Sequence, residues 1–359
     1  MKKSILLKII LTVLAVSMIF TGCGTEANNQ LPAGENPPVA ENQSTEETPS
    51  GEGAEGENEK EEVTSAYGII INEEDVVFTD ATGEEVSIKK NPQRVVVLQN
   101  SLLEIWDQAG GQVVGRVEES EDKIVENAMS AEVVGAMGAP SLEKILSVEP
   151  DLVIISGSYT AQREMVPLLR QNNIQVINLM NDLLEDYYRT VRLFTAITER
   201  EDLYENHIQD IQKKVDEIVA KAPKDKNYKA VIIFTTAKNT TVRDSTSMVG
   251  EMLKDLNLTN ISDSVEAGGD TRTFSLEKIL QEDPDFIFVQ TMGSDLEAIA
   301  ERLKSDAMDN PAWASLTAVK EDRYIVLSKD LYLYKPNDRY PEAYENLAKM
   351  IYPEVFGGY

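Results

Sequence analysis

The chain has 359 residues, of which 42% are hydrophobic and 27% are charged, and its formal net charge is −28. This length and composition suit a globular protein of two or three domains, and the acidic balance argues against nucleic-acid binding, which requires a basic face. The single cysteine, Cys23, excludes an intramolecular disulfide.

The first 23 residues have the pattern of an export signal. Three lysines precede an apolar run from Ile9 to Phe20 that is too short for an ordinary membrane span. The run ends in Phe-Thr-Gly-Cys23, which resembles the lipobox of bacterial lipoproteins, with phenylalanine in place of the usual leucine. We therefore expect residues 1–23 to be a lipoprotein signal peptide whose Cys23 becomes the lipid anchor. An uncleaved anchor or an ordinary signal peptide would also place the rest of the chain outside the cytoplasm.

Residues 24–74 are predicted to be a disordered acidic tether. Between Glu26 and Glu62 there are eleven glutamates and one lysine, and large apolar residues are almost absent. Such a segment cannot bury enough apolar surface to offset the entropy that ordering would cost. Its like charges repel one another and extend it.

The folded part is predicted to begin near Val76 with a β-hairpin that turns at Gly83. Ser101 is expected to cap a helix over 102–108, which a pair of glycines ends. The strands predicted for this first lobe are 76–80, 85–88, 94–98, 113–115, 133–135, 152–155 and 174–179.

One motif occurs twice, with the copies 134 positions apart. It reads Ser141-Leu-Glu-Lys-Ile-Leu and then Pro150-Asp before an apolar run, and it recurs as Ser275-Leu-Glu-Lys-Ile-Leu and then Pro284-Asp. The serine can cap a helix, and the glutamate lies in the first turn, where the helix dipole favours an anion. The apolar run after Pro-Asp predicts a strand that is buried on both faces. A helix that leads into such a strand is half of a βαβ unit, so two copies predict two similar α/β lobes.

Two helices are predicted between the lobes. Apolar residues recur at helical spacing over 183–197, and Thr198 with Glu201 fits a capping box that would start a second helix. That helix continues to Lys221 and is stopped by Pro223. From Glu201 to Lys221 it would span about 32 Å, long enough to act as a strut along two lobes.

The second lobe repeats the pattern of the first. Its predicted strands are 230–234, 286–289 and 324–327, and its predicted helices are 247–256, 275–280, 297–305, 311–316 and 341–351. The predicted organisation is therefore a signal peptide 1–23, a tether 24–74, an N-terminal α/β lobe 75–182, connecting helices 183–222 and a C-terminal α/β lobe 223–359.

The order of these features resembles a known family. Asp80-x-x-Gly83, Asn91-Pro-x-Arg94-Val-Val-Val, the doubled motif and the long helix are similar to those of the substrate-binding proteins of iron-complex and cobalamin ABC importers, the class III binding proteins. The resemblance covers about residues 75–355. It implies two doubly wound, Rossmann-like α/β lobes joined by a long rigid helix, with a ligand cleft between the lobes at the carboxyl ends of the strands, as in other open α/β sheets.

The resemblance also implies a docking role for one glutamate on each lobe, which would contact arginines of the membrane permease. The positions that match are Glu143 and Glu277. The residues alone leave a simpler interpretation open, in which both side chains only interact favourably with a helix dipole.

The segments that follow the strands should line the cleft. Arginine and tyrosine in these segments suit a polyanionic iron chelate, because arginine offers planar donors to catecholate, carboxylate or hydroxamate oxygens. A ferric siderophore is therefore the preferred ligand. The predicted ligand-binding residues are Asn100, Met137, Tyr159, Arg163, Arg243, Arg272, Met292, Tyr332 and Tyr334, and the wider lining adds Gln99, Ser101, Ser158, Asn181, Lys238, Thr273 and Lys335.

Other ligands stay open. Haem is one alternative, with Met137, Tyr332 or Tyr334 as the axial ligand, and cobalamin is another. A site for a bare metal ion is not expected, because it needs several histidine or carboxylate ligands. The single histidine, His207, lies in the strut beside apolar residues and is predicted to be an ordinary helix-face residue.

An enzyme is not expected, and neither is a cofactor. Residues 75–359 contain no glycine-rich nucleotide-binding signature, and without a suitable histidine or a second cysteine the usual nucleophilic triads cannot form. A carboxylate-pair hydrolase and a ligand sensor of the same fold remain as alternatives. The preferred function is that of a monomeric, lipid-anchored receptor on the cell membrane, which captures an iron complex outside the cytoplasm and passes it to an ABC permease.

Overall fold

The computed structural model describes residues 66–118, 124–264, 272–273 and 275–358. The predicted signal peptide with Cys23 and most of the predicted tether lie outside the described residues. Ile69 is fully buried, and β1 (Ile70–Ile71) pairs with β2 (Asp75–Thr79). The folded part therefore starts before residue 74, the predicted end of the tether. Its first isoleucines add a strand to the predicted hairpin and bury apolar surface against it. No helix of the described residues is long and apolar enough to cross a lipid bilayer.

The N-terminal lobe is built on a parallel sheet. In the described residues its strand order is β10-β9-β4-β5-β6, and every neighbouring pair is parallel. The strands of this sheet are β4 (Val95–Val97), β5 (Gly115–Arg116), β6 (Glu132–Val133), β9 (Leu152–Ser156) and β10 (Gln175–Leu179). Alternate residues of β9 belong to different hydrophobic clusters, since Ile154 packs with the connecting helices and Val153 with the opposite face. The sheet is therefore covered on both faces, as the uninterrupted apolar run predicts.

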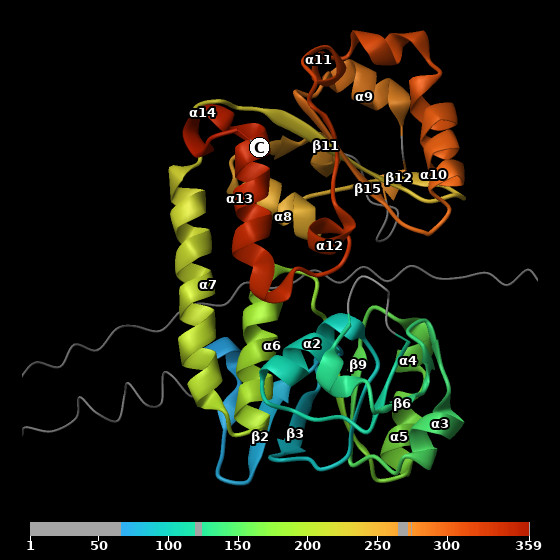
Figure 1. Cartoon of the computed structure of the whole chain (residues 1–359), viewed down its shortest axis with the longest axis vertical. Helices are drawn as coiled ribbons and strands as arrows, with labels where there is room; N and C mark the ends of the chain where they lie inside the picture. The colour runs from blue at the N-terminus through green and yellow to red at the C-terminus, as the bar shows by residue number, and fades with distance from the viewer. Residues whose placement is uncertain (1–65, 119–123, 265–271, 274, 359) are drawn as a thin grey trace, which may run out of the picture. The chain divides into compact units, whose positions relative to one another are not determined.

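Short helices and hairpins complete this lobe (Figure 1). Its helices are α2 (Asn100–Gln108), α3 (Leu142–Ser147), α4 (Thr160–Arg163) and α5 (Val166–Gln171). Its antiparallel pairs are β2 with β3 (Glu85–Lys89), which confirms the predicted hairpin, and β7 (Gly135–Ala136) with β8 (Ala139–Pro140).

Two helices lead from the first lobe to the second. α6 (Leu184–Ile197) is buried over most of its surface, and α7 (Glu201–Lys221) has the 21 residues that the apolar spacing predicts. α7 packs against both α6 and the C-terminal helix α13 (Tyr340–Ile351) (Figure 1).

The predicted capping box at the start of α7 is wrong. Thr198 is the C-cap of α6, and its hydroxyl donates to the carbonyls of Ala109 and Phe194 at 2.6 and 2.9 Å. Glu199 has a φ of 55°, which turns the chain between the two helices, so that Thr198 belongs to the helix before the turn. The N-cap residue of α7 is Arg200, and its side chain makes no capping hydrogen bond.

The C-terminal lobe has a mixed sheet. In the described residues its order is β14-β12-β11-β15-β16, with β13 also paired to β11. β12 is antiparallel to both of its neighbours, β11 and β14, and the remaining pairs are parallel. Its strands are β11 (Lys229–Thr235), β12 (Thr240–Arg243), β13 (Thr259–Asn260), β14 (Arg272–Thr273), β15 (Phe286–Thr291) and β16 (Tyr324–Val326). Its other helices are α8 (Met248–Asp255), α9 (Leu276–Glu282), α10 (Leu296–Leu303), α11 (Thr317–Lys320), α12 (Lys329–Tyr332) and α14 (Pro353–Phe356).

The doubled motif has the same structure in both lobes. Ser141 caps α3 and accepts a hydrogen bond from the backbone N–H of Lys144 at 3.4 Å, and Ser275 caps α9 through Lys278 at 3.3 Å. Each helix then leads into a buried parallel strand, β9 or β15. The two separate sheets confirm the prediction of two α/β lobes.

Ser101 does not cap α2. The helix begins one residue before it, at Asn100, and the N-cap residue Gln99 makes no capping bond with its side chain. The Ser101 hydroxyl is buried inside the first turn and has no hydrogen-bond partner among the described residues.

Candidate functional site

The candidate site begins at the carboxyl ends of the N-terminal strands, where loops leave the sheet along one edge. Tyr159 follows β9 and is half-buried at the start of α4, and Asp182 follows β10. Burial, and then the charge of Asp182, raises the pKa of the Tyr159 hydroxyl above its ordinary value. Tyr159 therefore stays a neutral phenol at physiological pH and can donate a hydrogen bond.

A buried glutamine, Gln162, holds three of these loops together. Its Oε1 accepts from the backbone N–H of Ser156 at 2.9 Å, while its Nε2 donates to the carbonyls of Leu98 at 2.8 Å and Met137 at 2.7 Å. Gln162 is fully buried on α4, the short helix that also carries Arg163. Sequence reasoning missed this residue, because a glutamine on a short helix carries no signal of the carbonyls that lie around it.

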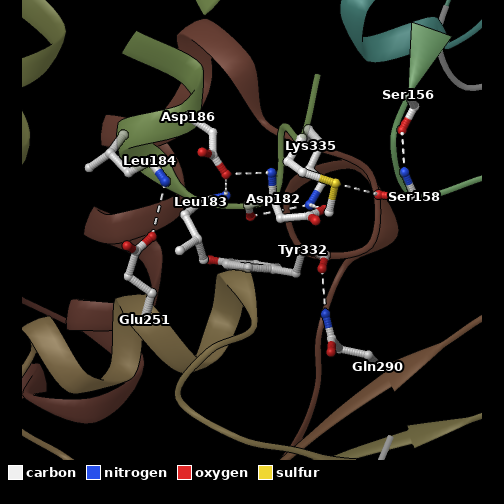
Figure 2. A network of polar contacts seen from close by, with 11 residues as sticks. Ser156, Ser158, Asp182, Leu183, Leu184, Asp186, Glu251, Gln290, Tyr332 and Lys335 are labelled. Atoms are coloured by element: carbon white, nitrogen blue, oxygen red, sulfur yellow. Dashed lines mark hydrogen bonds and ion pairs between the residues drawn. The ribbon is translucent and has the colours of Figure 1, made fainter. Parts of the chain in front are cut away.

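The corresponding edge of the C-terminal lobe is tied together in a similar way. Gln290, near the end of β15, donates from Nε2 to the carbonyl of Tyr332 at the end of α12 (Figure 2). Lys329 donates from Nζ to the carbonyl of Gly293, just after β15, at 2.7 Å. The loops after β15 and β16 are therefore fixed to each other.

The two edges meet through an ion pair. Lys335, three residues after α12, places its Nζ 3.0 Å from a carboxylate oxygen of Asp182 and 3.2 Å from the Asp182 carbonyl (Figure 2). The backbone N–H groups of Asp182 and Leu183 both donate to Asp186 at 3.0 Å, which fixes the loop that carries the carboxylate. The end of β10 in one lobe and the segment after α12 in the other thus lie side by side.

Further contacts join the C-terminal lobe to the N-terminal lobe and to the connecting helix α6. Asn337 is fully buried and donates from Nδ2 to the Ser101 carbonyl at 3.1 Å and to the carboxylate of Glu104. Glu251 in α8 accepts a hydrogen bond from the backbone N–H of Leu184 at 3.0 Å, at the start of α6 (Figure 2). Burial raises the pKa of Glu251, although the bond from Leu184 acts in the opposite direction.

The other predicted N-terminal residues lie at or near this edge. Asn100 is half-buried at the start of α2 and donates to the Glu118 carbonyl at 3.2 Å. Arg163 is exposed, and its guanidinium donates to the Gly157 carbonyl and to the Thr160 hydroxyl. Met137 is half-buried and packs against the hydrophobic cluster on one face of the sheet.

Met292 and Tyr334 lie at the corresponding edge of the C-terminal lobe. Met292 directly follows β15 and is 54% exposed. Tyr334 is half-buried, and its backbone N–H donates to the Lys329 carbonyl at 2.9 Å.

The structure does not bring Tyr332 to the same surface. Its side chain is only 2% exposed, and its hydroxyl donates to the Ala343 carbonyl at 2.9 Å inside the C-terminal lobe. α12 is a single turn whose Leu331 and Tyr332 face the core, so the hydroxyl already has an internal partner.

Arg243 and Arg272 lie within strands and not, as predicted, in loops that follow strands. Arg243 is in β12 opposite Ile232, and its guanidinium carbon lies 4.2 Å from the centre of the Phe234 ring. Arg272 is in β14, which pairs with β12. The error has a physical cause, because β12 is a short strand with a mostly polar sequence that no apolar run reveals.

The two predicted docking glutamates have matching environments. Glu143 lies in the first turn of α3 and Glu277 in the first turn of α9, and both are exposed. Neither carboxylate pairs with a cation among the described residues, since Lys144 donates to the Val133 carbonyl and Lys278 pairs with Glu282.

The side chains at the strand ends suit the binding of a ligand. His207 is half-buried on α7, and the described residues contain no group of three histidine, cysteine or carboxylate side chains that could hold a metal ion. The strand ends provide the neutral phenol of Tyr159, the guanidinium of Arg163, the Lys335–Asp182 pair and the exposed thioether of Met292. These groups suit contact with a ligand that carries both charge and apolar surface.

Comparisons with known proteins agree with the two-lobed fold. A family model described as "Periplasmic binding protein" matches residues 95–331, which is more than half of the chain. The Fe(3+)-citrate-binding protein YfmC of Bacillus subtilis (strain 168) is 25% identical over 266 residues, covering 71% of this chain and 78% of that protein. The uncharacterized ABC transporter substrate-binding lipoprotein YvrC of the same strain is 27% identical over 296 residues, covering 78% of this chain and 87% of that protein.

A solved structure gives the same result for the fold. The crystal structure of S. aureus IsdE complexed with heme is similar with a TM-score of 0.62 at 19% identity, covering 72% of this chain and 98% of that chain. Together with the doubled motif and the two sheets, the match to the family model shows that this chain belongs to the periplasmic binding protein family.

Proposed function

We propose that this chain is the extracytoplasmic receptor of an ABC importer, that it captures a ferric chelate, and that a ferric siderophore is its ligand. The observation that carries the proposal is that the lobes of a periplasmic-binding-protein fold contact each other through the loops at their strand ends, where Lys335 pairs with Asp182. The carboxyl ends of open α/β sheets are where such folds bind ligands.

The side chains at this edge support an anionic chelate. Arg163 brings a positive charge and Tyr159 a phenolic donor, while the charge of Lys335 is balanced by Asp182. The relative named for ferric citrate agrees with an iron-chelate ligand. Met137 packs against the lobe's own hydrophobic cluster, which argues against its role as an axial ligand of haem.

Binding is tested by isothermal titration calorimetry with ferric citrate, a ferric hydroxamate, a ferric tris-catecholate and cyanocobalamin. Haemin is titrated in parallel by absorbance, where a Soret band reports a ligated porphyrin iron. We expect saturable binding of a ferric chelate by one site per chain. The proposal would be contradicted if none of the ferric chelates bound, or if the protein chemically converted any of them.

Delivery to the permease is proposed to depend on Glu143 and Glu277. Their exposure, their lack of a cationic partner in the described part of the chain and their equal positions on the two lobes support this role. An exposed carboxylate on each lobe can contact two basic sites at once, which makes the paired contact stronger than either alone.

The double variant Glu143→Ala/Glu277→Ala should retain the chelate affinity of the unmodified protein and abolish uptake of radiolabelled iron by cells. The matched control is Glu126→Ala/Glu297→Ala, since both of these glutamates are exposed and lie in the first turn of another helix. Loss of affinity in the first variant, or equal uptake by both, would remove the docking role.

The membrane attachment is also proposed. A relative named as a lipoprotein supports it, together with the lipobox-like sequence that ends in Cys23. Replacement of Cys23 by alanine should shift the protein from the membrane fraction to the medium, as immunoblotting of fractions would measure.

A further inference from the structure

Each lobe exposes one methionine at the carboxyl end of a parallel strand of its sheet. Met180 directly follows β10 and is 41% exposed, and Met292 directly follows β15 and is 54% exposed. Methionine usually fills gaps in a protein core, where its flexible thioether packs well. Packing within either lobe does not explain why an apolar side chain stands in solvent at the carboxyl end of a parallel strand in both sheets.

Both methionines flank the contact between the lobes. Asp182 lies two residues after Met180 and accepts the ion pair from Lys335. On the other side, Gln290 lies two residues before Met292 and holds the Tyr332 carbonyl, three residues from Lys335. The thioethers therefore leave their sheets on either side of the place where the candidate ligand residues gather.

The backbone around each methionine is arranged to present it. The Met180 sulfur lies 3.9 Å from the Ser158 hydroxyl, and a Cβ at Gly157 would lie 2.9 Å from that sulfur, so the glycine leaves room for the thioether. The Met292 backbone N–H donates to the Thr235 carbonyl at 3.0 Å, and the next residue, Gly293, has a φ of +121°. The chain thus turns directly after Met292, while its side chain stays exposed.

We propose that Met180 and Met292 contact the flat aromatic face of the ligand, so that the receptor selects an aromatic iron chelate over a small polycarboxylate. A polarizable thioether makes favourable contacts with aromatic rings, and the neutral phenol of Tyr159 lies on the same edge. A ferric citrate complex has no apolar face and would leave both thioethers without a partner. This inference rests on the proposed function and adds the chemical class of the chelate to it.

The test compares three ligands by calorimetry on the full chain: a ferric tris-catecholate, haemin and ferric citrate. The variant is Met180→Gln/Met292→Gln, which keeps the side-chain length and removes the apolar surface. We expect the unmodified protein to prefer an aromatic chelate over ferric citrate, and the variant to lose about tenfold in affinity for that chelate alone.

The matched control is Met129→Gln/Met308→Gln, because these methionines are 48% and 43% exposed and do not follow a strand. It should bind every ligand as the unmodified protein does, and thermal unfolding should show that both variants fold. Rescue of affinity by Met180→Leu/Met292→Leu would identify apolar contact as the cause. If haemin binds most tightly, and the glutamine variant binds it less tightly, the inference is supported and the aromatic ligand is a porphyrin.

Two results would overturn the inference. One is that the unmodified protein binds ferric citrate and the aromatic chelates with equal affinity. The other is that the glutamine variant loses affinity equally for all ligands. Neither result contradicts the proposed receptor function. If no ferric chelate binds at all, the proposed function itself is contradicted.

Discussion

At the scale of single residues, the site depends on side chains whose role is to hold other groups in place. Gln162 uses its amide oxygen and both amide hydrogens on backbone groups of three loops. Those loops carry Asn100, Met137 and Tyr159, so the glutamine positions predicted ligand residues without being exposed to a ligand. Buried polar groups of this kind contribute most when every partner is satisfied.

Replacing Gln162 by methionine keeps the volume and removes the partner of three backbone groups, two of them in buried hydrogen bonds and one in a partly buried one. We expect the free energy of unfolding to fall by about 3 kcal/mol, and chelate affinity to fall as the loops lose their common anchor. Urea unfolding and calorimetry measure the two effects. Gln171→Met, at an exposed position in α5, is the control, and an unchanged stability of the Gln162 variant would contradict the positioning role.

Glu251 makes the stability of the molecule depend on pH. Its pKa in the folded chain is raised by burial above the unfolded value of about 4.3. The folded state therefore keeps the proton over a pH range in which the unfolded chain has lost it, so the Glu251 contribution decreases as the pH rises through that range.

Glu251→Gln should for this reason be more stable than the unmodified protein at pH 7, because a neutral amide can still accept the bond from Leu184. The difference should disappear below a pH of about 4, where the carboxyl is protonated in both states. Thermal unfolding across pH measures this difference. The exposed Glu301→Gln should show no such trend, and a less stable Glu251→Gln at pH 7 would contradict the argument.

At the scale of elements, the doubled motif was fully predictable and its surroundings were not. Ser141 and Ser275 cap helices because each precedes an amphipathic turn and is followed by a buried strand. Ser101 and Thr198 have the same chemical signal but do not cap, since the helix next to Ser101 starts a residue earlier and Thr198 ends α6. A local sequence pattern cannot decide at which of two neighbouring residues a helix begins, because tertiary packing makes that choice.

The caps give a direct comparison of these cases. Ser141→Ala should lower the free energy of unfolding by about 1 kcal/mol, because the first turn of α3 loses its side-chain acceptor. Ser101→Ala should change it by less than about 0.5 kcal/mol, since the Ser101 hydroxyl has no partner to lose in the described residues. Denaturant unfolding measures both, and a larger loss at Ser101 would reverse the assignment of the caps.

The same limits explain how much of the site was foreseen. Uninterrupted apolar runs revealed β4, β9 and β15, and hence the edge where Tyr159 and Met292 lie. The polar strand β12 gave no such signal, which misplaced Arg243 in a loop. Tyr332 was expected at the ligand surface because its sequence position follows a strand, but a single turn of helix directs it inward.

At the scale of the whole folded part, a few polar contacts beside the candidate site hold the two lobes against each other. Lys335 is the cation of the ion pair, and its side chain is 19% exposed while that of Asp182 is 42% exposed. A pair that is largely shielded from solvent on one side contributes about 1 kcal/mol. It therefore biases the balance between closed and open lobes by about fivefold.

Lys335→Met removes the charge and keeps the apolar stem. We expect the free protein to open more often, with a larger radius of gyration in small-angle X-ray scattering, and its chelate affinity to decrease because ligand must first bring the lobes together. Lys320→Met, at an exposed position in α11, is the control. Identical scattering curves for the Lys335 variant and the unmodified protein would show that the ion pair does not hold the lobes.

The burial of α6 has a consequence for the way the molecule comes apart. From Thr190 to Ile197 every side chain of this helix is buried, so local opening would expose it only together with its neighbours from both sides. Its amide hydrogens should accordingly exchange with deuterium at the slow rate set by global unfolding, whereas those of the outward-facing turns of α3 and α9 should exchange far sooner. Mass spectrometry of deuterated fragments would then report the global free energy of unfolding from one short peptide of α6, with or without bound ligand.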